Sequence, residues 1–359
     1  MSRSAISFSD LQGWMEDDHR AALACFKMSA RGFVENASVT RVGKPPSKAL
    51  LKIAEKSLAK DFENPTSDAA RVFFEEHFVP TVLTPKESGF VTAYFEPVVP
   101  ASRIKSSQFS YPIYRRPSDL IRLNENDEYP KGLPKNLQYA RKTPNGLEEY
   151  YDRQAIDEGA LSDQGLELFW VKSSIEAFFI HVQGSARLEL DDGEAARISF
   201  AGKSGHVYSS IGKHLVDKGV FTPETANMQN LRKWLEDDLE RANEVLHQNR
   251  SYIFFTEVEG HHPEFGPIAA AGVQLTPGRS LAVDKLIHPY GTPVWINTDE
   301  PLPSYVNRFQ RLMIAQDTGS AIVGPQRGDI FIGSGDEAGM IAGGVRHTTQ
   351  FVVFEPKSS

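Results

Sequence analysis

The segment "MIAQDTGSAIVG" at residues 313–324 sets the fold of the C-terminal third of the chain. A short apolar run ends there at Asp317 and passes into a glycine turn. The pattern recurs after it in "QRGDIFIGSG" (326–335) and before it in "GRSLAVDKLIHPYGTPVWI" (278–296). Short apolar runs bounded by Gly, Asp, Pro and Ser predict strands joined by tight turns. We therefore expect residues from about 250 to the C-terminus to be all-β.

Strand-like sequence also fills the chain upstream of this segment. The sequence changes there to strand-like segments rich in aromatic and β-branched residues, "GFVTAYFEPVV" (89–99) and "SYPIYRR" (110–116). Residues 100–150 are rich in Pro, Asn and charge, and predict loops with short strands. Residues 167–190, dense in aromatic and β-branched side chains, predict a hairpin system, and the Asp-Gly pair that follows predicts a turn into another strand.

Helices are expected at the start of the chain and in one later stretch. Residues 9–30 carry an apolar stripe and a capping box at Ser9 and Gln12. A later helix is predicted to begin with Thr222 as its N-cap and Pro223 at its first position. The sequence thus predicts helices over four ranges: 9–30, 47–60, 67–79 (closed by Pro80) and 222–248. Because strands and helices do not alternate, the pattern argues against a doubly wound parallel sheet. We expect a mainly β protein with peripheral helices.

Composition narrows the functional classes. The 359 residues carry a formal net charge of -8 and no basic block, which argues against a nucleic-acid partner. No run of about 18 apolar residues predicts a membrane span. The single cysteine, Cys25, excludes an internal disulfide. The N-terminus lacks the apolar core of a signal peptide, so neither export nor a membrane anchor is visible in the sequence.

Several local motifs suggest chemistry that the rest of the chain does not support. The Asp-Thr-Gly-Ser run at Asp317 is typical of aspartic proteases, but those need two such aspartates and no second motif is present. His261 and His262 are adjacent, so in an extended loop they point apart and make poor metal ligands. The glycines at 333–339 lack both the dinucleotide spacing and a P-loop lysine. We therefore predict no metal and no cofactor.

Three aspartates remain as the candidate site. Asp284, Asp317 and Asp329 each lie beside a predicted strand and a turn, the last two 12 residues apart. Acidic groups among apolar strand residues are costly unless they are paired or hydrogen-bonded. Each one alone could simply cap a turn, since Asp is a favoured turn residue. Three of them within one all-β segment favour a site.

These segments together resemble one known family. The C-terminal part resembles the three-aspartate domain, a double-psi β-barrel. The upstream part is similar to the membrane-bound lytic murein transglycosylase A family in five motifs that occur in the same order: "GFVTAYFEPVVPASR", "YPIYRRP", "FFIHVQGSARLEL", "AGKSGHVYSSIG" and "NRSYIFF". The resemblance implies a double-psi β-barrel catalytic domain built from residues 1–97 and 259–359. It also implies a second β-barrel domain, 98–258, inserted between them as the other wall of a glycan-binding groove.

The same resemblance implies an activity. The family cleaves the β-1,4 bond between N-acetylmuramic acid and N-acetylglucosamine in peptidoglycan and leaves 1,6-anhydromuramic ends. Asp329 matches its single acid/base, and Asp317 and Asp284 match the two supporting aspartates. Asp317 would raise the pKa of Asp329 by its like charge, or hold Asp329 by a hydrogen-bond chain. The groove-lining motifs match further residues expected to contact glycan: Thr92, Tyr94, Gln183, Gly184 and Ser185.

The resemblance also implies a partner and a location. The expected partner is the peptidoglycan glycan strand, with a cell-wall remodelling complex as a further candidate, and the expected location is the periplasm or cell envelope. A second function stays open, because related double-psi barrels bind wall polymers without cleaving them. The three aspartates and the groove motifs favour the enzyme over such a binding protein.

Overall fold

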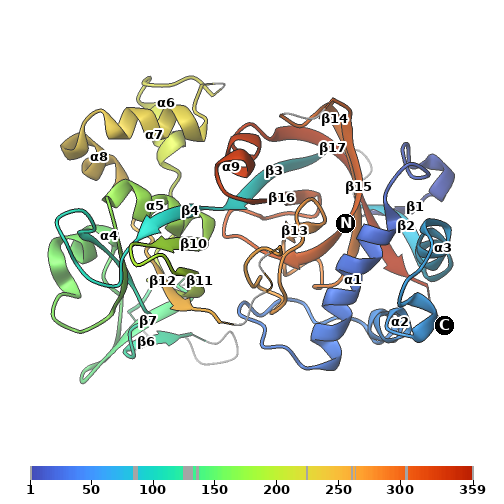
Figure 1. The fold of residues 1–359 in the computed structure, drawn as a ribbon, viewed down its shortest axis with the longest axis horizontal. Coiled ribbons are helices and arrows are strands. Elements are labelled where there is room, and N and C mark those ends of the chain that lie inside the picture. The colour runs from blue at the N-terminus through green and yellow to red at the C-terminus, as the bar shows by residue number, and fades with distance from the viewer. Residues whose placement is uncertain are drawn as a thin grey trace. The chain divides into compact units, whose positions relative to one another are not determined.

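A computed structural model describes residues 2–83, 88–123, 132–134, 137–223, 225–259, 262, 264–303 and 306–357. The chain divides into two compact units, the first built from residues 1–95 and 261–359 and the second from 96–260. Each unit contains β-sheets with helices beside them (Figure 1). Across the described ranges, every helix is too short or too polar to cross a membrane.

A closed barrel forms the centre of the first unit. Its strands follow one another as β3, β17, β14, β15, β13 and β16, and β3 pairs again with β17 to close the ring. β2 and β1 extend the sheet from β17, and β13 runs parallel to β15. The bounds are β1 Arg3–Ala5, β2 Phe78–Leu83, β3 Gly89–Glu96, β13 Ser280–Val283, β14 Pro293–Pro301, β15 Arg308–Asp317, β16 Arg327–Ser334 and β17 Arg346–Pro356.

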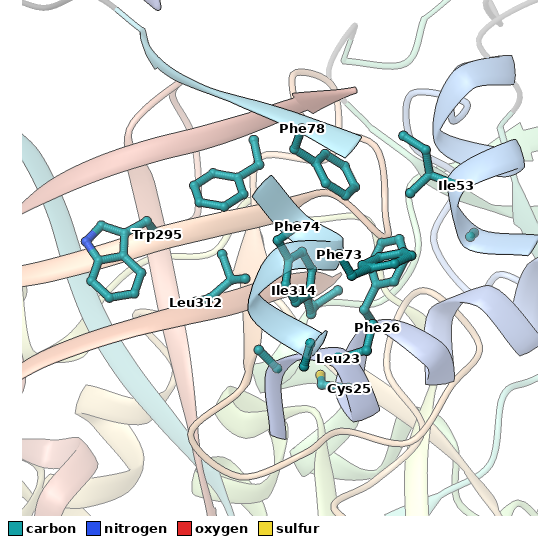
Figure 2. Packing of buried hydrophobic residues seen from close by; sticks show 14 of the residues in the cluster. Leu23, Cys25, Phe26, Ile53, Phe73, Phe74, Phe78, Trp295, Leu312 and Ile314 are labelled. Carbon is teal, nitrogen blue, oxygen red and sulfur yellow. The ribbon is translucent and has the colours of Figure 1, made fainter. Parts of the chain in front are cut away.

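Helices pack against this barrel. They are α1 His19–Val34, α2 Lys48–Ser57, α3 Ser67–His77 and α9 Asp336–Gly343, with one 3-10 turn at Phe8–Asp10 and another at Lys60–Phe62. Figure 2 shows Leu23 and Phe26 of α1 and Phe74 of α3 facing Leu312 and Ile314 of β15. The cluster is fully buried, and burying each such side chain stabilises the fold by about 1.5–3 kcal/mol. This packing anchors the strand whose last residue is Asp317.

The second unit contains a second ring of strands. A four-stranded sheet in the order β12, β11, β10, β4 meets the pair β5 and β9 through two single bridges, Ser102 to Trp170 and Arg115 to Phe255. A separate three-stranded sheet joins β6, β7 and β8. The bounds are β4 Val98–Ala101, β5 Tyr111–Tyr114, β6 Leu120–Arg122, β7 Tyr139–Thr143, β8 Gly146–Glu148, β9 Glu167–Val171, β10 Ser185–Leu190, β11 Ala195–Lys203 and β12 Ile253–Glu257.

Helices occupy the rest of the second unit. They are α4 Arg153–Ala155, continued by a π-turn at Ile156–Ala160, α5 Ser174–Gln183, α6 Ile211–Asp217, α7 Met228–Glu236 and α8 Leu239–Leu246. α5 packs on α7 and α8 through a common apolar cluster that includes Phe178 and Leu235. The mainly β class with peripheral helices and two β-barrels, predicted from the sequence, is confirmed.

Two predicted helices are corrected by their caps. The first begins at His19 rather than Ser9, because Asp18 accepts the amide of Ala21 as its cap. The preceding residues form turns held by Asp17, whose carboxylate is buried against Arg279 at 2.8 Å. The capping box belongs to Ser7 and Asp10, not to Ser9 and Gln12.

The predicted helix over 222–248 is two helices. Asn227 caps α7, and Asp238, with an extended backbone, ends that stretch and caps α8. Thr222 accepts the amide of Thr225 in a turn outside both helices. Earlier in the chain, α3 ends at His77, and Pro80, expected only to close it, lies inside β2.

The predicted hairpin system over 167–190 is also wrong, because its middle residues form a helix. α5 lies between β9 and β10, capped by Ser173 and ended by Gly184 in the left-handed conformation at φ 79°. The helix is apolar on almost every side because it is buried, so its aromatic residues imitate a strand. The Asp-Gly turn after β10 is confirmed, since β10 and β11 pair in antiparallel register.

Candidate active site

Two of the three aspartates lie level with one another across the barrel sheet. Asp329 of β16 and Asp317 at the end of β15 both pair with Ala282 of the intervening strand β13. Residues paired in this way point to the same face of a sheet, with their Cα atoms two strand spacings, or about 10 Å, apart. The fold therefore presents both carboxylates on one surface of the first unit.

Asp329 is held from the neighbouring strand β3. The Thr92 hydroxyl donates a hydrogen bond to Oδ1 of Asp329. Thr92 in turn accepts a hydrogen bond of 2.6 Å from Nη2 of Arg327, two residues before Asp329 on β16. The Asp329 side chain is half-buried, and its neighbours in sequence, Ile330 and Phe331, are fully buried.

This environment makes Asp329 a weaker acid than an ordinary aspartate. Burial raises the pKa of Asp329 to about 6, against the opposing effects of the Thr92 hydrogen bond and the Arg327 charge. The like charge of Asp317 adds the smallest of these effects, also upward. A carboxyl group with this pKa exists in both forms near neutral pH, as a general acid that must later act as a base requires.

Asp317 has both carboxylate oxygens engaged. Oδ2 accepts the Tyr94 hydroxyl at 2.9 Å, and Oδ1 accepts the backbone amide of Ala270 at 3.1 Å. The Tyr94 ring packs on Phe331 at 5.3 Å. Burial, followed by the charge of Asp317, raises the pKa of Tyr94 well above its usual range, so this hydroxyl stays protonated as a donor. Arg41 donates to the carbonyl of Thr318 at 2.6 Å beside this pair.

Asp284 also has both oxygens engaged, by two loops. It follows β13 and is 9% exposed. Oδ1 accepts the amide of Leu286 at 3.0 Å, and Oδ2 accepts the amide of Gly324 at 2.8 Å. Gly324 lies in the connection between Asp317 and Asp329, so Asp284 fixes the shape of that connection.

The structure brings together some of the predicted site residues. Thr92 and Tyr94, expected to contact glycan, bind Asp329 and Asp317 through their hydroxyls. Gln183 and Gly184 end α5 and Ser185 begins β10, all in the second unit. Their contact with glycan stays a prediction. In the ranges described, no three His, Cys, Asp or Glu side chains gather as a metal site.

Sequence reasoning missed the groups that orient the aspartates. Arg327 could have been found, because residues two apart on a strand share a face and Arg327 is two residues before Asp329. The amides of Ala270, Leu286 and Gly324 have no sequence signal, since every residue other than proline offers one.

The chain is similar to known proteins in sequence and in fold. Residues 90–256 match the MltA specific insert domain, and residues 279–355 match the 3D domain. The membrane-bound lytic murein transglycosylase A of Escherichia coli (strain K12) is 36% identical over 264 residues, which are 71% of this chain and 62% of that protein. The matched part of the chain thus spans less than two thirds of that curated relative.

Solved structures extend the likeness to nearly the whole chain. A membrane-bound lytic murein transglycosylase from Agrobacterium tumefaciens is 42% identical with a TM-score of 0.90, over 99% of this chain and 98% of that one. E. coli MltA with bound chitohexaose is 25% identical with a TM-score of 0.66, over 100% of this chain and 95% of that one. Together with the two domain matches, these likenesses mean that the chain belongs to the membrane-bound lytic murein transglycosylase A family.

Proposed function

We propose that this protein is a peptidoglycan lytic transglycosylase with Asp329 as its single acid/base. The substrate is the glycan strand, cut at the β-1,4 bond between N-acetylmuramic acid and N-acetylglucosamine. Family membership supports this substrate class, and the E. coli relative solved with chitohexaose shows that a family member binds a glycan of this type. Cleavage of wall glycan would place the protein in the cell envelope.

One observation carries the choice of a lyase over a hydrolase. Of the three aspartates, Asp317 and Asp284 have both oxygens occupied by donors, whereas Asp329 uses only Oδ1 among the described contacts. An ordinary glycosidase needs two working carboxylates, one as acid and the other as base or nucleophile. A site with one available carboxylate fits a reaction in which the substrate supplies its own nucleophile.

The proposed reaction uses Asp329 twice. The protonated carboxyl group gives its proton to the glycosidic oxygen, and the bond from that oxygen to C1 of the muramic residue breaks. The C6 hydroxyl of the same residue attacks C1, and the Asp329 carboxylate takes the hydroxyl proton. No water enters, and Asp329 ends in its starting form. Because nucleophile and electrophile belong to one sugar, the attack avoids the entropy cost of holding a second reactant.

The other two aspartates and the second unit support the reaction at Asp329. Asp317, held by Tyr94, supplies negative charge on the same face as Asp329, where an oxocarbenium-like transition state carries positive charge. Asp284 keeps the connection from Asp317 to Asp329 in shape. We propose that the segment 98–258 forms the other wall of the groove and that Gln183, Gly184 and Ser185 contact glycan from it.

The test is a digest of purified peptidoglycan with the native chain and with Asp329→Asn, read by mass spectrometry. We expect muropeptides lighter by one water than reducing ones from the native chain, and a loss of at least a hundredfold in the variant. Asp299→Asn, on an exposed part of β14, is the matched control and should cut normally. Reducing ends would indicate a hydrolase. Retained wall binding without any products would indicate the binding protein instead.

A further inference from the structure

Among the residues that the structure describes, Arg327 is held beside the proposed acid/base by a hydroxyl, a backbone carbonyl and an aromatic ring. Nη2 donates to the Thr92 hydroxyl at 2.6 Å, and Nη1 donates to the backbone carbonyl of Gly328. The guanidinium carbon lies 5.3 Å from the centre of the Phe90 ring, within the range of a cation–π contact. The half-buried guanidinium is thus held so that its charge reaches Asp329 through one intervening hydroxyl.

The direction of these hydrogen bonds follows from the donors available. A guanidinium can only donate, so Thr92 Oγ1 must accept from Arg327. The one hydroxyl proton of Thr92 is then directed to Oδ1 of Asp329. A proton on Oδ1 would compete with this donor, so the transferable proton of Asp329 is placed on Oδ2. Among the described contacts Oδ2 accepts no hydrogen bond, so it is the oxygen left to carry and transfer this proton.

We infer that Arg327 is a positioning residue for Asp329: acting through the Thr92 hydroxyl, it assigns the transferable proton to Oδ2 and stabilises the carboxylate that forms when this proton leaves. The inference rests on the proposed function for its catalytic meaning. The hydrogen-bond chain from Arg327 to Asp329 stands on geometry alone.

The inference explains how one carboxyl group can serve both halves of the reaction. Burial by itself favours the protonated acid and would leave a poor base. Arg327 and the Thr92 hydrogen bond both lower the pKa of Asp329, against burial and the like charge of Asp317. The Tyr94 hydroxyl donates to Asp317. Among the described groups, Arg327 supplies the positive charge that lowers the pKa of Asp329.

The test measures the ionisation of Asp329 without relying on activity. The carboxyl carbon of Asp329 is followed by NMR in aspartate-labelled protein, assigned by the signal that Asp329→Asn removes. Arg327→Met should raise the pKa of Asp329 by about one unit, the low end of the effect of a neighbouring opposite charge. Arg308→Met, which removes an exposed arginine of β15 in the same unit, should leave it unchanged.

Variants of Thr92 test the path. Thr92→Ser keeps the hydroxyl and should titrate like the native chain, while Thr92→Val should raise the pKa of Asp329 as Arg327→Met does. A lowered pKa in Thr92→Val would mean that Arg327 acts on Asp329 directly, which would overturn the relay. Arg327→Lys keeps the charge but loses the planar guanidinium that reaches Thr92 and the Gly328 carbonyl together, and should titrate between the native chain and Arg327→Met.

Activity then separates this inference from the proposed function. In Arg327→Met, kcat should fall about tenfold with little change in KM, and the high-pH limb of the rate profile should move upward with the measured pKa. An unchanged NMR titration in Arg327→Met would overturn the inference even if anhydro products still form. A shifted titration in a protein that makes no anhydro products would leave the positioning intact and remove the proposed function.

Discussion

Asp329 on β16 and the aspartates after β15 and β13 are chemically identical side chains in very different surroundings. Asp317 and Asp284 each receive a backbone amide and a second donor, which satisfy both oxygens. Asp329 receives one hydroxyl and lies among buried apolar residues. At Asp329 burial outweighs the single hydroxyl donor, so the charged form is disfavoured and the pKa is raised. The number of donors, rather than the residue type, distinguishes the candidate acid from its two supports.

The difference has a cost that can be measured as stability. The folded-state pKa of Asp329 is raised from the ordinary value of 3.8 to about 6, so the folded chain binds this proton more tightly than the unfolded chain does. The stability that the protonated form contributes is complete below about pH 4 and is lost as the pH rises to about 6. An ionised Asp329 therefore destabilises the fold at neutral pH.

The largest effect is expected from removing this charge. Asp329→Asn cannot ionise at this position. The difference in free energy of unfolding, variant minus native chain, should therefore increase by about 2–3 kcal/mol from pH 4 to pH 7. Urea unfolding at several pH values measures the difference. Asp299→Asn, at an exposed position, should show no such trend. A difference that stays constant with pH would mean that Asp329 has an ordinary pKa in the folded protein.

The sequence indicated the carboxylates but not what holds them. Apolar runs ending at Asp, with glycine turns, located β13, β15 and β16 because strand and turn chemistry is local. Thr92 and Tyr94 share one face of β3 by strand periodicity, and the prediction placed both at the site. Thr92 and Tyr94 reach their aspartate partners because β3 pairs with β17 and lies beside β16. Both of these strands are more than two hundred residues away in the sequence, and no local pattern encodes such a pairing.

The errors in secondary structure have the same origin. α5 is buried, so it lacks the polar face that identifies a helix, and its aromatic residues favoured strands. The break between α7 and α8 depends on one extended residue, Asp238, within an otherwise continuous helical pattern. In both cases the tertiary environment overrides local propensity. The predicted glycan groove has one wall from residues 1–97 and 259–359 and the other from residues 98–258. This groove stays a prediction.

A smaller effect on stability is expected at Asp284. In Asp284→Asn the amide nitrogen cannot accept a hydrogen bond, so one of the amides of Leu286 and Gly324 loses its partner. The free energy of unfolding should fall by about 2 kcal/mol, the typical worth of a hydrogen bond to a charged group. The pH profile of the remaining activity should keep its midpoint. A shifted midpoint would instead assign Asp284 a direct electrostatic role in the reaction.

The smallest effect is expected at Asp317, and it distinguishes charge from hydrogen bonding. Asp317 raises the pKa of Asp329 through its charge, but at about 10 Å between Cα atoms this influence is weak. Asp317→Asn should therefore move the high-pH limb of the rate profile down by roughly half a unit. Tyr94→Phe removes the hydrogen bond to Asp317 and keeps the Asp317 charge, so the high-pH limb of its rate profile should not move. If Tyr94→Phe moves the limb and Asp317→Asn does not, a hydrogen-bond chain rather than charge links Asp317 to Asp329.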